Sequence, residues 1–171
     1  MKLKLTILSI GFLLGAYLAS AQVNIMVEAE TGDLTGTTQL KNNENASAGV
    51  FLQLKNSSSV SFAANGIPEA GAYKLNIYNF NGGATQEVTL TVNGASATVT
   101  LVASNWAYQG AAQATSLDVN LNAGNNTLTI SFLNVGVSLD YFEVTNGNPP
   151  SNGPTTYYLS EEGDDLNDGR S

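Results

Sequence analysis

The chain of 171 residues has no cysteine and no histidine, and its 14 acidic residues outnumber its six basic residues. The lack of cysteine excludes disulfides and a lipid anchor on a processed cysteine. The lack of histidine removes the usual general base, the Ser-His-Asp and Cys-His nucleophile systems, and the common zinc and copper ligand sets. Only oxygen ligands remain, and these suit hard cations such as calcium.

The first 21 residues have the layout of a secretory signal peptide. Lys2 and Lys4 precede a mostly apolar run over residues 5–18, and A-S-A at 19–21 is a small-residue cleavage site. A membrane anchor is the alternative, but the apolar run is short for a span of ~20 residues. We therefore expect a secreted protein, extracellular or periplasmic, that begins at Gln22 and does not contact a membrane after cleavage.

Signal cleavage would leave a strongly acidic chain. Without Lys2 and Lys4, four basic residues face 14 acidic ones, which gives a net charge of −10. A nucleic-acid partner requires a basic face, and an anionic membrane surface requires one too, so both partners are disfavoured. About 150 residues remain, enough for one domain, and we expect that domain to be a monomer.

Beyond the signal, short apolar alternations recur between turn residues, with no apolar stripe of helical period. Asn93-Gly94 predicts a two-residue hairpin, residues 122–126 predict a longer hairpin loop, and residues 127–132 alternate as in a half-buried antiparallel strand. This spacing predicts an all-β domain, either a sandwich or a barrel. The predicted strands are Ile25–Glu30, Phe51–Leu54, Ser59–Phe62, Gly71–Tyr78, Gln86–Val92, Ala97–Leu101, Ser116–Leu121, Asn125–Phe132 and Ser138–Val144.

The β domain is predicted to cover residues 22–146. It is followed by a Pro- and Gly-rich run, N-G-N-P-P-S-N-G-P over 146–154, which indicates a linker placed at 147–154. The last 17 residues, 155–171, are too short to fold alone. We therefore expect the sequence to be the front end of a longer protein.

Two carboxylates lie two residues apart at the start of this domain. Residues i and i+2 of a strand point to the same face, so Glu28 and Glu30 are predicted to lie side by side and to repel each other unless they are neutralised. A calcium ion, with about six to eight oxygen ligands, would neutralise them. A solvated, outward-facing pair is the alternative. Asp140 would join the pair if the first and last strands are neighbours.

Four segments together resemble carbohydrate-binding modules of families 6 and 35. V-E-A-E at 27–30 resembles their opening, and A-G-A-Y-K-L at 70–75 resembles their central strand. L-N-A-G-N-N-T-L at 121–128 is similar to one of their hairpins, and L-D-Y-F-E-V at 139–144 to their closing strand. The resemblance implies a jelly-roll β-sandwich with a structural calcium where the first and last strands meet.

By this resemblance, Glu28, Glu30 and Asp140 are the side-chain ligands of the calcium, and backbone carbonyls of residues 45–48 complete its shell. Nothing in the sequence suggests an arranged substrate between the carboxylates, so we assign them no acid or base catalysis.

Trp106 is the only tryptophan, in the polar segment A-S-N-W-A-Y-Q-G. An indole stacks well on the C–H face of a sugar ring, although a core tryptophan that fills the sandwich is the alternative. The resemblance favours the sugar, because the corresponding loop of family 6 modules borders a binding cleft. The partner is therefore predicted to be a polysaccharide or oligosaccharide.

Other candidate sugar contacts follow from the same resemblance. Phe51 lies where the family usually has a second tyrosine or tryptophan, and it could equally be a core residue. Side-chain amides offer both a donor and an acceptor to a hydroxyl, although asparagine is also common in turns for its geometry. Besides Trp106 and Phe51, the candidates are Asn79, Asn81, Tyr108, Asn134 and Ser138.

The tail has a resemblance of its own. Y-Y-L-S at 157–160 and G-D-D-L-N-D-G at 163–169 resemble the opening of secreted right-handed parallel β-helix proteins, many of them polysaccharide lyases or glycoside hydrolases. The acidic run lacks the spacing of an EF-hand. The resemblance implies that the parent protein is such an enzyme and that this chain holds none of its catalytic residues.

The leading hypothesis is a non-catalytic carbohydrate-binding module of a secreted polysaccharide-degrading enzyme. A calcium-stabilised structural or adhesive sandwich without a sugar site is the alternative, and an independent enzyme is disfavoured by the missing histidine. Neutral β-glucans, xylans, agarose and uronic-acid polymers all remain open as ligands. Highly sulfated chains are disfavoured because a net charge of −10 repels polyanions.

Overall fold

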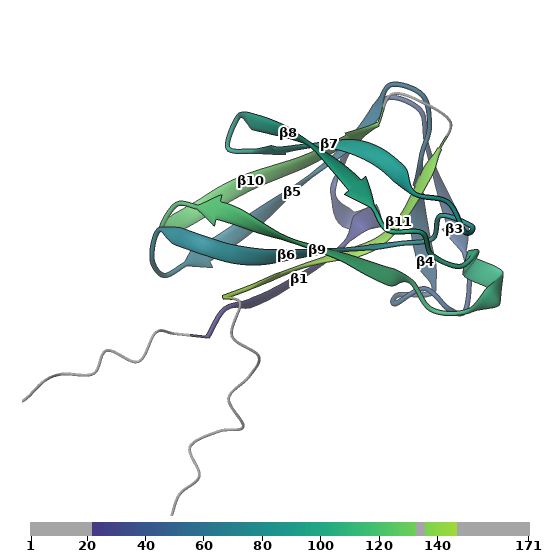
Figure 1. The fold of residues 1–171 in the computed structure, drawn as a ribbon, viewed down its shortest axis with the longest axis horizontal. Helices are drawn as coiled ribbons and strands as arrows, with labels where there is room; N and C mark the ends of the chain where they lie inside the picture. The colour runs from purple at the N-terminus through teal and green to yellow at the C-terminus, as the bar shows by residue number, and fades with distance from the viewer. Residues whose placement is uncertain (1–21, 133–135, 147–171) are drawn as a thin grey trace, which may run out of the picture.

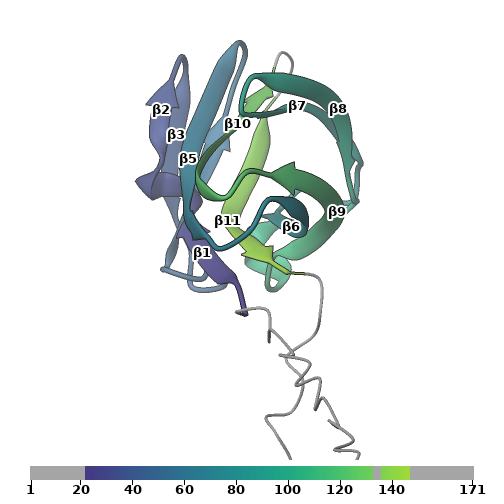
Figure 2. The same ribbon diagram turned by 90° about the vertical axis from the view of Figure 1, so that its left-hand side faces the viewer.

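The computed structural model describes residues 22–132 and 136–146, which form two antiparallel sheets packed face to face (Figures 1 and 2). Sheet A comprises β1 (Asn24–Glu28), β3 (Thr38–Asn42), β4 (Val50–Leu54), β6 (Gly71–Asn79), β9 (Gln113–Leu121) and β11 (Val137–Thr145). Sheet B comprises β2 (Asp33–Thr35), β5 (Ser58–Ile67), β7 (Gln86–Val92), β8 (Ala95–Leu101) and β10 (Gly124–Phe132). Two 3-10 turns, η1 (Ala29–Thr31) and η2 (Ala107–Gln109), complete the elements.

The strand order is β3-β4-β11-β6-β9 in sheet A, with β1 also paired to β11, and β2-β5-β10-β7-β8 in sheet B. This is the all-β jelly-roll sandwich that the sequence predicted. Within the described ranges, no helix is long and apolar enough to cross a membrane.

The predicted strands all occur, but the prediction is wrong in three details. The first strand stops at Glu28 and does not reach Glu30, which lies in η1. The strands β2 and β3 were missed, because they are short, polar and mostly exposed and therefore lack an apolar alternation. The hairpin loop predicted at 122–126 is shorter, because β10 already begins at Gly124 with a bulge before Asn126.

The tight hairpin between β7 and β8 is confirmed. Asn93 and Gly94 both have positive φ angles, 49° and 90°, as a two-residue turn of this kind requires. The backbone N–H of Asn93 also donates to the carbonyl of Thr127 at 2.9 Å, which fixes the hairpin to β10.

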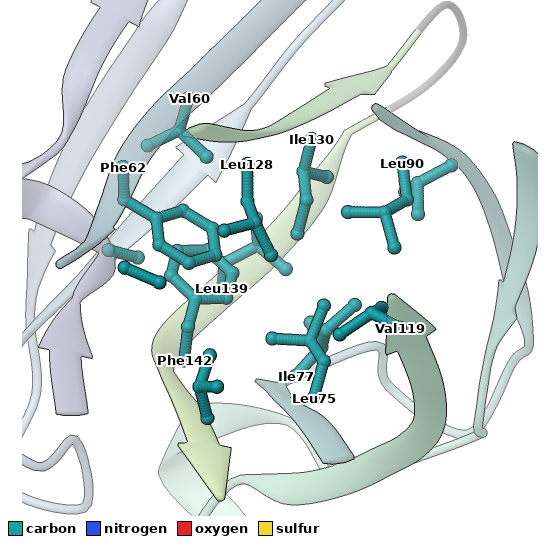
Figure 3. Packing of buried hydrophobic residues seen from close by; sticks show 14 of the residues in the cluster. Val60, Phe62, Leu75, Ile77, Leu90, Val119, Leu128, Ile130, Leu139 and Phe142 are labelled. Carbon is teal, nitrogen blue, oxygen red and sulfur yellow. The ribbon is translucent and has the colours of Figure 1, made fainter. Parts of the chain in front are cut away.

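The core lies between the two sheets and is filled by alternate residues of facing strands (Figure 3). The rings of Phe62 on β5 and Phe142 on β11 stack with their centroids 4.2 Å apart and their planes 3° apart, so they join sheet B to sheet A. The predicted alternation of β10 is confirmed, because Leu128, Ile130 and Phe132 are buried in this core.

Strand β11 pairs with three strands of sheet A, and two of them lie along the same edge of β11. Along that edge β4 pairs with Val137–Leu139, and β1 pairs with residues 141–145. The opposite edge pairs with β6, with a bulge between Leu139 and Phe142. Asp140 therefore has no registered partner on either edge. The first and last strands of the domain are neighbours, as the sequence predicted.

Truncation of Phe142 tests the importance of the stacked ring pair. We expect Phe142→Ala to lower the free energy of unfolding by about 3–5 kcal/mol, because it opens a cavity between the sheets. Urea denaturation would measure the change. Met26→Ala on neighbouring β1 is the control, since Met26 is exposed and should change stability by no more than about 0.5 kcal/mol. Equal effects of the two substitutions would contradict this account of the core.

Candidate functional site

Three carboxylates gather where β1 and β4 meet along β11, and we call Glu28, Glu30 and Asp140 the acidic seam. Glu28 ends β1 opposite Tyr141, and Glu30 follows in η1. The prediction that Glu28 and Glu30 share one strand face is wrong, because the chain turns at Ala29. They still interact with each other and with Asp140, since each of the other two carboxylates helps to raise the pKa of Glu30.

Ser47, in the loop between β3 and β4, joins two members of the acidic seam. Its backbone N–H donates to both carboxylate oxygens of Asp140, at 3.0 and 3.3 Å. Its hydroxyl lies 3.1 Å from Asp140 Oδ1 and 2.5 Å from Glu28 Oε2, and its single proton can serve only one of them at a time. Burial raises the pKa of Asp140, the hydrogen bonds from Ser47 oppose this shift, and the charge of Glu28 adds to it.

Glu30 is the least satisfied member of the acidic seam. Its Oε2 atom is buried and has no hydrogen-bond partner, and burial is the main cause of its raised pKa. A buried acceptor without a partner is costly and calls for an explanation. The oxygen-only donor set fits a hard cation, although in the described ranges no three such side chains converge as a complete metal cluster.

Trp106 stands apart from the main core, immediately before η2. The residue is 50% exposed, which excludes the alternative of a core tryptophan that fills the sandwich. Its indole lies against Gly82, because a Cβ atom built there would sit 2.2 Å from Trp106 Cε2. Gly82 also has a φ of +61°, so glycine is favoured there both by space and by backbone conformation.

Main-chain hydrogen bonds hold the Trp106 segment against the turn after β6. Gly83 N donates to the carbonyl of Ser104 at 2.6 Å, and Gly82 N donates to that of Asn105 at 3.5 Å. The amide of Trp106 donates to Gln109 Oε1 at 3.0 Å. The indole is therefore carried by a fixed stretch of backbone.

The two asparagines at the end of β6 have different surroundings. Asn79 is 0% exposed and lies inside the protein, where it accepts from the Ser104 hydroxyl at 2.8 Å and donates to the carbonyl of Gln113 at 3.1 Å. Asn81 is 8% exposed, and its side-chain oxygen, Oδ1, has no hydrogen-bond partner. Asn81 thus has a buried acceptor without a partner beside the Trp106 segment, whereas the acceptor of Asn79 is already paired.

A second, smaller group of apolar residues supports this end of the molecule, and we call it the loop-end cluster. Its rings are Phe80, which the sequence reasoning missed, and Phe51, with centroids 5.4 Å apart and planes inclined at 56°. Phe51 is half-buried, so much of its ring serves packing. The cluster comprises the buried residues Ala46, Phe80 and Ala107 with the partly buried Phe51 and Ala112.

The loop between β3 and β4 contacts both the acidic seam and the Trp106 segment (Figure 1). Ser47 reaches Asp140, as described above. Two residues earlier, Asn45 donates from Nδ2 to the carbonyl of Ala107 at 2.8 Å, directly after Trp106. Between them, Ala46 is buried in the loop-end cluster. One short loop thus links the two groups of candidate residues.

The other candidates are placed as follows. Tyr108 is 72% exposed at the rim of η2. Ser138 is buried on β11, and its carbonyl accepts a hydrogen bond from Phe80 N at 2.9 Å. Asn134, the signal peptide over 1–21 and the tail from residue 147 onward lie outside the described residues.

No protein-family model matches this chain, and no curated protein sequence matches it. Solved structures do match. A family 35 carbohydrate-binding module from Clostridium thermocellum matches with a TM-score of 0.62 at 22% identity, over 71% of this chain and 98% of that one. The match with an exo-β-1,3-galactanase from Phanerochaete chrysosporium has a TM-score of 0.62 at 24% identity, over 71% of this chain and 29% of that one.

A third match is a GH26-CBM35 β-(1,4)-mannanase from Podospora anserina, with a TM-score of 0.60 at 20% identity, over 74% of this chain and 28% of that one. The chain thus spans less than a third of each of these two enzymes and nearly all of the C. thermocellum module. At these identities the likeness establishes the fold.

Two glycine substitutions test the contact between Trp106 and Gly82. We expect Gly82→Ala to displace the indole and to change the wavelength and intensity of tryptophan fluorescence, because the new methyl would overlap the ring. Gly83→Ala is a matched control, since Gly83 also has a positive φ but its Cβ would meet nothing within 4 Å. Identical spectra for the two variants would refute the contact.

Proposed function

We propose that residues 22–146 form a non-catalytic carbohydrate-binding module of a secreted polysaccharide-degrading enzyme. The observation that carries the proposal is the half-exposed indole of Trp106, backed by Gly82 and held by main-chain hydrogen bonds. A fixed indole face is a suitable platform for the C–H face of a sugar ring. Asn81 lies in the adjoining turn, but its unpartnered Oδ1 is buried, so a sugar hydroxyl could donate to it only if the turn opened.

The contacts of this site are assigned by what each side chain has available. Trp106 supplies the stacking face and Tyr108 a rim contact, whereas Asn81 is buried and holds the turn beside the indole to Ser104 and Val102. Phe51 supports the site from the loop-end cluster instead of forming a second face. Asn79 and Ser138 are buried inside and hold the backbone in place. A single open aromatic face suits one sugar ring stacked from one side.

The matching structures support this proposal at the level of the fold. One is named as a carbohydrate-binding module, and the galactanase and mannanase act on polysaccharides according to their names. A binding module linked to an enzyme keeps the enzyme at a high effective concentration near its substrate. The proposal includes secretion by the signal peptide at 1–21, a linker at 147–154 and the start of a β-helix domain at 155–171.

A structural calcium ion at the acidic seam is part of the proposal. Glu28, Glu30 and Asp140 would hold it with carboxylate oxygens, the ligands that calcium prefers. The ion would neutralise the carboxylates whose charges help to raise the pKa of Glu30 and Asp140, and it would satisfy the unpartnered Oε2 of Glu30. Its role there would be electrostatic. The attraction between the ion and the carboxylates on both sides would hold the end of β1 to β11.

Truncation of Trp106 tests sugar binding. We expect Trp106→Ala in the secreted chain from Gln22 onward to lower affinity for the bound glycan by about five- to tenfold on a glycan array, since the loss of one stacked ring costs about 1–1.5 kcal/mol. The melting temperature should stay close to that of the parent chain, because the indole lies outside the main core.

Leu40→Ala is the control. Leu40 is an exposed apolar side chain on β3, in sheet A, and this variant should bind the glycan as the parent chain does. If the Trp106→Ala variant is folded and binds as the parent chain does, the Trp106 site is wrong. If the parent chain binds no glycan on the array, a structural or adhesive sandwich without a sugar site becomes the preferred function.

Glu30→Gln tests the calcium site. Calcium at about 100 times its dissociation constant should raise the melting temperature of the parent chain by on the order of 10 °C. The variant should lose most of this rise. In a chelator it should melt at or above the parent temperature, since it has one less like charge in the acidic seam.

Glu87→Gln on β7 removes the same charge from sheet B and should retain the full calcium response. Differential scanning calorimetry with calcium and with chelator measures all three proteins. A parent chain that does not respond to calcium would eliminate the site.

A further inference from the structure

A pocket of about 470 Å³ lies at the opposite end of β3 and β4 from the Trp106 segment. Thr37 precedes β3 and Lys55 follows β4, whereas the loop that reaches Trp106 joins the other ends of these two strands. Lys55 N donates to the carbonyl of Thr37 at 2.9 Å, which closes this end of the strand pair. The pocket is lined by Thr37, Gln53, Lys55, Asn56 and Gly136.

The pocket opens on the face of sheet A that points away from the core. Side chains alternate along a strand, and Leu52 and Leu54 of β4 are buried in the main core. Phe51, Gln53 and Lys55 therefore project from the other face. Lys55 lies four positions after Phe51, so the two residues are about 13 Å apart along the strand at ~3.3 Å per residue. The pocket is thus a place distinct from the loop-end cluster, on the same face of the same strand.

The side chains of this pocket have their polar groups available. Within the described part of the chain, the side chains of Thr37, Gln53, Lys55 and Asn56 have no hydrogen-bond or ion-pair partner. Lys74, in contrast, forms an ion pair with Asp118 at 2.8 Å. Among the residues that the structure describes, no acidic side chain lines the pocket. An acidic domain thus presents one unpaired ammonium group in a hollow otherwise lined by hydroxyl, amide and main-chain groups.

We infer that this pocket is a second carbohydrate subsite and that it takes a carboxylated sugar residue, a uronic acid unit of a glycan chain. Lys55 matches the single carboxylate through a charge-assisted hydrogen bond. Thr37, Gln53 and Asn56 match the ring hydroxyls, since each side chain can both donate and accept. The volume lies within the ~300–1,000 Å³ of small-molecule sites. This inference rests on the proposed function, because it takes a glycan as the ligand.

Charge narrows the choice among anionic ligands. A chain with a net charge of −10 after signal cleavage repels polyanions over long range, and the pocket holds one lysine to offset this. One carboxylate surrounded by hydroxyls therefore fits better than a densely sulfated chain. A neutral sugar would leave the ammonium group of Lys55 without a partner.

The experiment compares trisaccharides of galacturonic and glucuronic acid with their methyl esters, which keep the hydroxyls but lose the charge. Isothermal titration calorimetry is run on the parent chain from Gln22 onward and on Lys55→Gln. Lys74→Gln is the control, since it removes the same charge from sheet A away from the pocket. We expect the parent chain and Lys74→Gln to bind at least one acid about tenfold more tightly than its ester, and Lys55→Gln to lose this preference.

Trp106→Ala separates the two proposals. It should weaken the acid and the ester alike and leave their ratio unchanged if the carboxylate sits at Lys55. Amide NMR signals of Gln53, Asn56 and Gly136 should shift with the acid in this variant. The inference is overturned if the parent chain shows no preference for either acid, or if the preference survives Lys55→Gln. A lost preference in Lys55→Gln with no effect of Trp106→Ala would sustain the pocket as an independent site, and the glycan array with Trp106→Ala would then decide the Trp106 site by itself.

Discussion

The break in strand pairing at Asp140 is the constraint on which the candidate site depends. β11 must accept β4 and then β1 along one edge, and the residue between them pairs with neither. A bulge on the opposite edge leaves it unpaired there too. The carboxylate of Asp140 is also buried there, so it needs hydrogen-bond donors from another part of the chain. Ser47 supplies them with its amide and hydroxyl, and so the loop before β4 is drawn over the seam.

The loop between β3 and β4 connects the acidic seam to the Trp106 segment. Ser47 holds the seam, Ala46 packs in the loop-end cluster and Asn45 binds the main chain after Trp106. Contacts made by three consecutive residues thus connect the acidic seam to the backbone that carries the indole. Coupling of this kind is reciprocal by thermodynamic necessity. Occupancy of a cation site and affinity for a sugar would then influence each other in this domain.

Most of the candidate functional residues lie outside the main core, which is the main source of the domain's stability. The main core joins sheets A and B through Phe62 and Phe142, whereas Trp106, Asn81 and the pocket at Lys55 lie outside it. Substitutions at Trp106 and Lys55 should therefore change the proposed glycan binding with little effect on folding. The acidic seam is the exception, because its carboxylates lie between strands, where burial raises the pKa of Glu30 and Asp140.

The sequence by itself determined the all-β class, most strand positions and the Asn93-Gly94 hairpin, because alternation and turn chemistry are local signals. Only the tertiary structure decided the rest. It placed Glu30 in a turn, exposed Trp106 against Gly82, buried both Asn79 and Asn81, and gathered the pocket at Lys55. These features depend on contacts between residues far apart in the chain, and no local pattern encodes them.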